Sequence, residues 1–297
     1  MGMSLPEAAH VLAAYDALRD VDVIHDHTVL GALLHRDDRA RAGRPPVVLT
    51  YHNPFTPAAK KVLASVGDAV LVAISAHHAR TARGLPVGAV IHHGVDLDRY
   101  HPRHRDPHDG CYLLFLGRMS PDKGVDRAVR VARRAGRRLV VASRMRSRDE
   151  FAYYEEKVLP ELRSGDEVHA EVSQEEAARL LAGAAALLNP ISWPEPFGLV
   201  MAEALASGTP VLTFPEGAAP EIVDDDSTGF VCASEDEMVK AVQLVGHIDR
   251  RRCRQVAEQR FSIDRMARDY ERLYTAVAHS VDLRNVLTTR DAVPTRG

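Results

Sequence analysis

The sequence predicts an α/β protein whose parallel sheets are covered by helices on both faces, in two successive doubly wound domains. Short continuous apolar runs alternate with segments of helical spacing along nearly all of the 297 residues. Continuous apolar strands separated by helices are typical of parallel sheets that are buried on both faces. A charged, proline-containing stretch at residues 101–110 separates two such series and indicates a linker.

Eight apolar runs are expected to form strands. They span residues 21–25, 45–52, 69–75, 89–94, 112–117, 138–143, 185–190 and 210–214, and helical spacing is found at 57–67, 126–136 and 173–186. The chain opens on a predicted helix, because Ser4 and Glu7 form a capping-box pattern with Pro6 in the first turn. A last helix is expected over residues 261–277, with Ser262 as its N-cap.

The domain boundaries follow from the linker and from these elements. We expect an N-terminal domain at residues 1–105 and a C-terminal domain at 106–262. Residues 263–279 should form a helix that packs back toward the N-terminal domain. Residues 280–297 lack periodicity and are predicted to be a loose tail.

The composition of the chain argues against some classes of function. The chain is 45% hydrophobic and 27% charged, as expected for a globular protein. The apolar run at 69–74 is far too short to span a bilayer. A net charge of −3 gives no bulk reason to expect nucleic-acid binding. Three widely spaced cysteines, at positions 111, 232 and 253, indicate reduced thiols and a cytoplasmic location.

The stretch WPEPFGLVMAE, residues 193–203, has a composition that suggests a ligand loop followed by a helix. Pro194 and Pro196 keep the chain around Glu195 extended and prevent an early helix start. Gly198 allows the backbone to pass close to a ligand. A helix is then expected to begin.

The start of that helix is a predicted anion site. Amides near residues 197–200 have no intrahelical acceptor, and the helix dipole adds positive potential there. Glu203 lies about 7–8 Å further along the helix axis. A ligand with an anionic middle and hydroxylated ends, such as a nucleotide sugar, would use both Glu195 and Glu203. The alternative is a solvated loop acid and an exposed helix acid.

A second motif, LGRMSPDKG at 116–124, places two cations at the end of a predicted strand. The strand ends at Gly117, Arg118 follows, and Lys123 precedes the next helix. Cations at the carboxyl end of a strand suit a pyrophosphate, and arginine can bind it with two parallel hydrogen bonds.

The segments FLGRMSPDKG and NPISWPEPFGLVMAEALASGTPVLTFPEGAAPEIV together resemble the donor-binding half of the family 4 retaining glycosyltransferases, which have the GT-B fold. DVIHDH, VAISAHHAR, VIHHGVDLDRYHP and FSIDRMARDYERLY also look like landmarks of that family, so the resemblance runs from about residue 21 to 277. It implies a GT-B-like α/β protein, in which two Rossmann-like doubly wound domains face a cleft. The N-terminal, acceptor-side domain would be shortened, and the C-terminal domain would bind the nucleotide sugar.

The resemblance also implies a diphosphate site. Arg118 and Lys123 would hold the donor diphosphate through their charges. The backbone amides of Phe197, Gly198 and Leu199 would complete this site.

Further roles are implied at the two ends of the donor. Glu203 would bind the ribose hydroxyls, and Glu195 would hold the donor sugar. His27 would reach the reacting sugar from the N-terminal domain, so His27 and Glu195 are the candidate catalytic residues. His52 and Gly117 are candidate cleft residues.

The implied activity is transfer of a hexosyl-type sugar from a nucleotide-diphosphate sugar to an acceptor, with retention of anomeric configuration. Fixed cations and helix amides would stabilise the departing diphosphate, so neither a metal nor a cofactor is expected. The acceptor class, whether sugar, lipid or natural product, stays open. The alternatives are a non-catalytic or degenerate nucleotide-sugar-binding protein and a GT-B epimerase or phosphorylase.

The histidines raise a metal site as an alternative. His25 and His27 share one face of a predicted strand. A metallohydrolase pattern would continue with an aspartate and a third histidine, but Val29 and Leu30 stand there. We therefore expect no metal. His27 could also simply cap the strand end.

A basic strip follows the phosphate motif. It comprises Arg127, Arg130, Arg133, Arg134, Arg137, Arg138, Arg144, Arg146 and Arg148. A solvated helix face is expected, with contact to an anionic membrane or acceptor as the alternative. Two departures from the family pattern are Ala170 and Ala218, each of which replaces a usual glycine.

The family usually has a further βα unit before the DVIHDH strand, including a glycine turn that faces donor and acceptor. Its lack here would leave apolar strands without neighbours. We expect the true start to lie upstream; the alternatives are a partner chain that covers the gap and a protein that has lost transfer but kept its nucleotide site. For the chain as given we expect self-association through the shortened domain, and nucleotide binding with weak sugar transfer.

Overall fold

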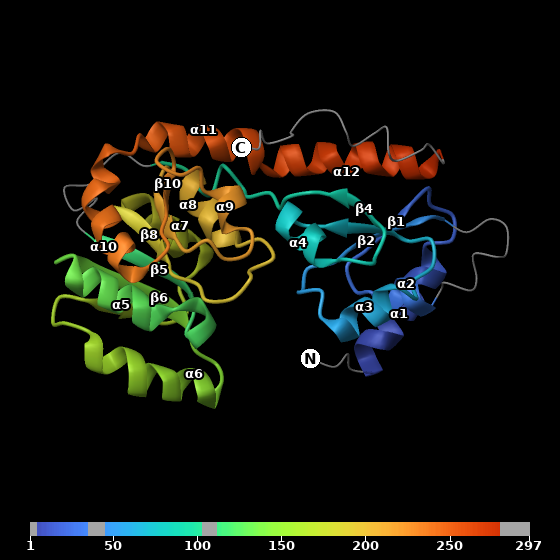
Figure 1. Ribbon diagram of the computed structural model, residues 1–297. Coiled ribbons are helices and arrows are strands. Elements are labelled where there is room, and N and C mark those ends of the chain that lie inside the picture. The colour runs from blue at the N-terminus through green and yellow to red at the C-terminus, as the bar shows by residue number, and fades with distance from the viewer. Residues whose placement is uncertain (1–4, 35–44, 103–111, 280–297) are drawn as a thin grey trace. The chain divides into compact units, whose positions relative to one another are not determined.

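The computed structural model describes residues 5–34, 45–102 and 112–279 (Figure 1). The chain falls into two compact units. Unit 1 comprises residues up to His92 together with those from Met266, and unit 2 comprises His93–Arg265. Most of the linker expected at 101–110, Ser4, Cys111 and the expected tail lie outside the described residues.

Unit 1 is built on a four-stranded sheet of parallel strands in the order β1-β2-β3-β4. Its strands are β1 (Ile24–Asp26), β2 (Val47–Thr50), β3 (Val70–Ala73) and β4 (Val87–Val90), and its helices are α1 (Leu5–Ala17), α2 (Leu30–Leu34), α3 (Pro57–Leu63), α4 (Ala76–Thr81) and most of α12 (Ile263–Ala278). Because a parallel sheet buries both faces, its strands read as continuous apolar runs.

Alternate residues of the unit 1 strands pack on opposite faces. Val48 and Val72 lie in a buried cluster with Leu273 of α12. Leu49 lies in a second cluster with Leu63 of α3. Figure 1 accordingly shows α12 on one side of this sheet and α1, α2 and α3 on the other.

Unit 2 contains six parallel strands in the order β10-β9-β8-β5-β6-β7. Its strands are β5 (Tyr112–Arg118), β6 (Arg138–Arg144), β7 (Glu167–His169), β8 (Ala186–Asn189), β9 (Val211–Thr213) and β10 (Gly229–Val231), and its helices are α5 (Val125–Arg134), α6 (Arg148–Tyr153), α7 (Gln174–Gly183), α8 (Leu199–Ala206), α9 (Ala219–Ile222), α10 (Glu235–Leu244) and α11 (Arg250–Arg260). A single 3-10 turn, Pro121–Lys123, joins β5 to α5.

Helices cover both faces of the unit 2 sheet. Leu113 and Phe115 of β5 share a buried cluster with Val129 of α5 and Val242 of α10. On the other face α7 contacts β5, and α8 contacts β8, β9 and α11. The predicted fold class, α/β with two doubly wound Rossmann-like domains, is confirmed.

Serine and threonine side chains cap the starts of six of the described helices. The amide of Arg265 donates to Ser262 Oγ at 3.2 Å, so the predicted cap of α12 is confirmed. Similar side-chain caps occur at Thr56, Ser75, Ser147, Ser173 and Ser234.

All eight predicted strands are present, with ends shifted by up to four residues. Two further strands, β7 and β10, were not predicted. Both have three residues and lie at the edges of the unit 2 sheet. Strands this short do not produce a readable apolar run.

Candidate functional site

The order of the unit 2 strands points to one place on the sheet. The chain passes from β5 outward to β6 and β7, then returns to β8 on the other side of β5. Ligands of open α/β sheets bind at the carboxyl ends of the strands where the order reverses. Lys123 follows β5, and Glu195 follows β8, so both lie beyond the strands that flank this reversal.

The structure brings these two predicted residues into direct contact. Lys123 Nζ forms an ion pair with Glu195 Oε2, and the two side chains are only 19% and 17% exposed. Trp193 Nε1 donates a hydrogen bond to the same oxygen at 3.1 Å. The Lys123 Nζ atom also lies 5.2 Å from the centroid of the Trp193 ring. Trp193 was missed as a site residue from the sequence.

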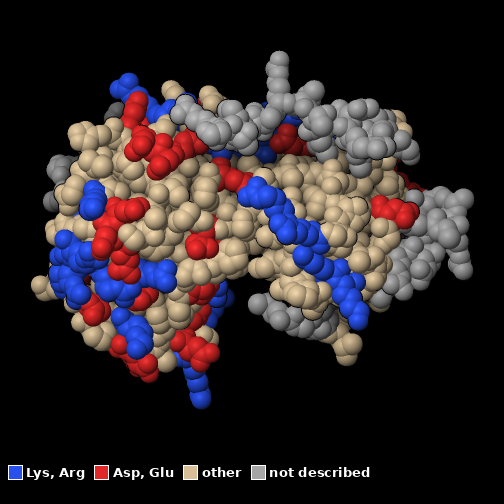
Figure 2. Space-filling model, in the orientation of Figure 1, with Lys and Arg blue, Asp and Glu red and all other residues tan. Residues whose placement is uncertain are grey.

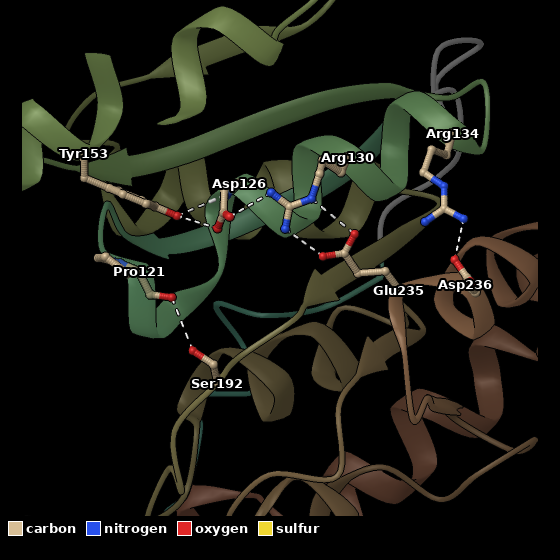
Figure 3. A network of polar contacts seen from close by, with 8 residues as sticks. All are labelled: Pro121, Asp126, Arg130, Arg134, Tyr153, Ser192, Glu235 and Asp236. Carbon is tan, nitrogen blue, oxygen red and sulfur yellow. Dashed lines mark hydrogen bonds and ion pairs between the residues drawn. The ribbon is translucent and has the colours of Figure 1, made fainter. Parts of the chain in front are cut away.

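Backbone contacts dock the Glu195 loop onto the turn that carries Lys123. The amide of Ser192 donates to the carbonyl of Asp122 at 2.9 Å, and Ser192 Oγ donates to the carbonyl of Pro121 at 3.3 Å (Figure 3). Gly124 has a φ of 74°, and a Cβ there would lie 2.1 Å from the carbonyl oxygen of Pro190. Only glycine permits this approach of the two segments.

A second glycine supports the other side of the loop. Gly217 has a φ of 61°, and a Cβ there would lie 2.3 Å from the Glu195 carbonyl oxygen. That oxygen accepts a hydrogen bond from the amide of Ala218 at 2.9 Å. Ala218 itself has a φ of −85°, which any residue adopts. The departure from glycine at Ala218 is therefore tolerated.

The other departure, Ala170, is exposed and is not among the described residues with positive φ. Its neighbour Glu171 has a φ of 54° instead. The left-handed conformation in this loop thus falls on Glu171, one position after the expected glycine.

The first turn of α8 is open. Gly198 precedes it with a φ of 94°, and no described side chain caps it. Leu199 is 44% exposed, whereas the ring of Phe197 is buried and contacts His93 edge to face at a centroid distance of 5.2 Å. Uncapped amides of a helix start can bind an anion, and that role stays a prediction for Gly198 and Leu199.

Arg118 is placed differently from Lys123. Its side chain is 51% exposed and forms an ion pair with Asp122 at 3.1 Å. Each predicted diphosphate cation is thus held by a carboxylate of unit 2. A phosphate group that binds Arg118 or Lys123 has to compete with that carboxylate.

Glu203 lies half-buried on α8. Burial raises the pKa of Glu203, and the neighbouring Tyr100 hydroxyl acts in the opposite direction. Burial, with the Glu203 charge next in importance, also raises the pKa of Tyr100. Tyr100, which the sequence did not single out, is thus electrostatically coupled to Glu203, the carboxylate predicted to bind the ribose.

In unit 1 the predicted histidines meet at the carboxyl ends of two neighbouring strands. His27 follows β1 and His52 follows β2, and His27 Nδ1 lies 2.8 Å from His52 Nε2. Their rings are stacked at a centroid distance of 5.1 Å. Burial lowers the pKa of both histidines. Neutral rings allow one to donate and the other to accept.

His25 contacts the ring of His27 and is itself held by hydrogen bonds. Its Nε2 lies 2.8 Å from Thr50 Oγ1, and its Nδ1 lies 2.6 Å from the hydroxyl of Tyr274. Burial, followed by the neighbouring His27 and His52, lowers the pKa of His25 to about 4. Tyr270 continues the network through a 2.8 Å contact with Thr50 Oγ1.

The aspartate of the DVIHDH stretch has a structural role. Asp26 is buried and accepts hydrogen bonds from the Tyr15 hydroxyl at 2.8 Å and from the Ala32 amide at 2.9 Å. Thr28 donates its amide and hydroxyl to the same carboxylate. Asp26 therefore shapes the turn in which His27 lies.

The basic strip of unit 2 is largely paired. The ion pairs join Arg130 to Asp126 and Glu235, Arg133 to Glu161, Arg134 to Asp236, Arg138 to Glu167 and Arg146 to Glu171. Several are visible in Figure 3, and Figure 2 shows basic and acidic side chains side by side over α5 and α6. At least five of the nine arginines are thus paired, which weakens the alternative of a membrane or acceptor contact.

Within the described ranges, no group of three or more His, Cys, Asp or Glu side chains is placed to hold a metal ion. The described helices also include none with the length and apolar character needed to cross a bilayer. The described cysteines, Cys232 and Cys253, are free, and burial raises the pKa of both thiols to about 12.

Comparison with known proteins identifies the family. The family model for glycosyl transferases group 1 matches residues 96–260, more than half of the chain. The chain belongs to the group 1 glycosyl transferases. The match includes Arg118, Lys123, Glu195 and Glu203, that is, every acidic or basic side chain predicted for the donor site in unit 2.

Individual relatives agree with this assignment. The chain is 32% identical over 214 residues to the D-inositol 3-phosphate glycosyltransferase of Mycolicibacterium paratuberculosis, a match that covers 65% of this chain and 45% of that protein. It therefore spans less than half the length of that relative.

Solved structures of similar fold include the following two. Sucrose-phosphate synthase from Thermosynechococcus elongatus matches with a TM-score of 0.79 and 20% identity, covering 93% of this chain and 78% of that one. HepE from Anabaena, solved with UDP and glucose, matches with a TM-score of 0.73 and 19% identity, covering 91% and 81%. These likenesses support the GT-B fold.

Proposed function

We propose that this group 1 glycosyl transferase is a family 4 retaining enzyme that moves a sugar from a nucleotide-diphosphate sugar to an acceptor without a metal ion. One observation carries the proposal. Lys123 and Glu195 meet beyond the two strands where the unit 2 sheet reverses its order, beside the open first turn of α8. The proposed ligand has an anion for the lysine and the helix start, and hydroxyls for the carboxylate.

In the proposed reaction, the nucleotide diphosphate leaves and the acceptor attacks the same face of the sugar. Negative charge grows on the departing phosphate as the glycosidic bond breaks. Arg118, Lys123 and the amides at the start of α8 would stabilise that charge from fixed positions. Since two cations and a helix start serve the diphosphate, the proposal does not require a divalent metal.

Glu195 is proposed to orient the donor sugar by accepting hydrogen bonds from its hydroxyls. His27 is proposed to contact the reacting sugar with Nε2, because His52 contacts Nδ1 and Nε2 makes no hydrogen bond with the described residues. Glu203, half-buried on α8, is proposed to bind the ribose.

The donor class is proposed from the site and from the fold. HepE, whose fold is similar, was solved with UDP and glucose. The base and sugar that this chain prefers are left to experiment, as is the acceptor, since similar proteins are named for different reactions, one as a D-inositol 3-phosphate glycosyltransferase and one as a sucrose-phosphate synthase.

A thermal-shift panel of UDP-, GDP-, ADP- and TDP-sugars tests the proposal, followed by release of free sugar or transfer with the nucleotide sugar that stabilises best. We expect one nucleotide to stabilise the protein, and turnover to persist in EDTA. Stabilisation without turnover would favour the non-catalytic alternative. Turnover that depends on phosphate, or that returns an epimerised nucleotide sugar, would favour the phosphorylase or epimerase alternative.

A further inference from the structure

Trp193 is the only tryptophan in the chain, and it lies inside the candidate donor site. Its indole N–H donates to Glu195 Oε2, and its ring lies beside Lys123. The side chain is half-buried, two residues before the carboxylate it holds. Neither the family assignment nor the sequence motifs give this residue a task.

Both donors to Glu195 use the same oxygen. Lys123 Nζ and Trp193 Nε1 contact Oε2, and no hydrogen bond within the described residues involves Oε1. Oε1 is thus available to a hydroxylated ligand, provided that the carboxylate keeps its orientation.

A diphosphate would disturb this arrangement. The ammonium of Lys123 cannot give its full charge to a phosphate and to Glu195 at once, so phosphate binding weakens the ion pair. Trp193 is then the remaining described donor to Glu195. Its indole N–H carries no charge, so a bound phosphate does not draw it away from Glu195.

We propose that Trp193 is a positioning residue that keeps the Glu195 carboxylate oriented toward the donor sugar when Lys123 turns to the diphosphate. This inference rests on the proposed function. Loss of the Trp193 donor should therefore weaken one ligand and not the other. A free nucleotide diphosphate needs Lys123 but not an oriented Glu195, whereas a nucleotide sugar needs both.

The test compares Trp193→Phe with wild type by calorimetry, using the nucleotide sugar selected by the panel and the matching free diphosphate. Phenylalanine keeps an aromatic ring beside Lys123 and removes the N–H donor together with one ring of the indole. We expect the affinity for the free diphosphate to stay within about twofold, and that for the nucleotide sugar to fall by about tenfold, the scale of one hydrogen bond to a charged group.

The same comparison in a Glu195→Ala background, which has no side-chain acceptor for the indole, controls for a merely structural role. There Trp193→Phe should add little, because the carboxylate it positions is already gone. Equal weakening of both ligands, or weakening of neither, would overturn the inference. Circular dichroism of each variant checks that the fold is retained.

Wild-type fluorescence gives a second readout that needs no substitution, because all indole emission comes from Trp193. Binding of the free diphosphate should change this emission as Lys123 leaves the ring. Unchanged emission at saturation would also overturn the inference. If the wild type binds neither ligand, the proposed function fails together with it, whereas binding with an unselective variant refutes the inference alone.

Discussion

Replacing Lys123 by alanine is the perturbation that most directly probes the diphosphate site. The side chain is 19% exposed and is paired with Glu195, so its loss removes one charge from a partly buried cluster. The fold should tolerate the change. Lys123 lies at the end of a surface 3-10 turn, and Trp193 still donates to Glu195.

The loss of diphosphate affinity expected in Lys123→Ala is the difference of two contributions. A charge-assisted contact from lysine to phosphate is worth about 1.5–3 kcal/mol. To make that contact, wild-type Lys123 has to weaken its ion pair with Glu195. We take the cost of this weakening as about 1 kcal/mol. The net loss in Lys123→Ala is therefore about 0.5–2 kcal/mol, or roughly 2- to 30-fold in Kd for UDP or GDP.

The two contributions separate in a double-mutant cycle. In a Glu195→Gln background the competing carboxylate is absent, so the free diphosphate should bind somewhat more tightly. Lys123→Ala should then cost about 1 kcal/mol more than it does in wild type. Calorimetry with free UDP and GDP on the four proteins measures this.

A matched control is Lys240→Ala, which removes an exposed lysine on α10 of the same unit and should change Kd by less than about twofold. Equal costs of Lys123→Ala in both backgrounds would refute the competition between Glu195 and phosphate. Wild-type affinity in Lys123→Ala itself would refute the diphosphate assignment.

Three further predictions concern the ribose end, metal dependence and pH. Glu203→Gln should weaken the binding of free UDP or GDP, and of the nucleotide sugar, by about tenfold, because it removes a charged acceptor for the ribose hydroxyls. Calorimetry that shows a loss of affinity for the nucleotide sugar alone would contradict the ribose assignment. Donor binding and turnover should survive EDTA, and a strict requirement for Mg²⁺ or Mn²⁺ in activity assays would contradict the proposed leaving-group stabilisation. The pKa of His25 falls from 6.5 to about 4 on folding, so the unfolded chain binds the proton more readily and stability should drop by about 2 kcal/mol as pH falls from about 6.5 to about 4. Urea unfolding should show a flatter pH dependence in His25→Asn than in wild type; identical slopes would assign the dependence to other groups.

Much of the fold was readable from the sequence, because buried parallel strands leave continuous apolar runs. The runs that became β5, β6 and β8 were found with nearly correct ends. The edge strands β7 and β10 were not found. With Glu167 exposed at its start, β7 has only one apolar residue, Val168, and therefore no pattern to read.

The candidate site was predicted residue by residue, but not its internal contacts. Lys123 and Glu195 were both assigned to the donor, yet their ion pair depends on β5 and β8 being neighbours in the sheet. Strand order is a tertiary property that periodicity does not encode. A signal for Trp193 was nevertheless present, since the only tryptophan of the chain stands two residues before Glu195.

The hydrogen bonds among the histidines and tyrosines of unit 1 could likewise be predicted only in part. His27 and His52 were expected at the same edge of the sheet, because the carboxyl ends of neighbouring parallel strands meet there. The contact between His25 and Tyr274 joins residues 249 positions apart. Only the packing of α12 on the sheet makes that contact.

The central claim, metal-independent transfer with retention from a nucleotide sugar bound at Lys123 and Glu195, is tested most directly by following donor hydrolysis with NMR. Water replaces the unidentified acceptor, and the first free sugar anomer is observed before it equilibrates. In EDTA we expect a first-formed sugar with the anomeric configuration of the donor, and a much slower release in Lys123→Ala. A first-formed sugar of inverted configuration, or release by Lys123→Ala at the wild-type rate, would contradict the account.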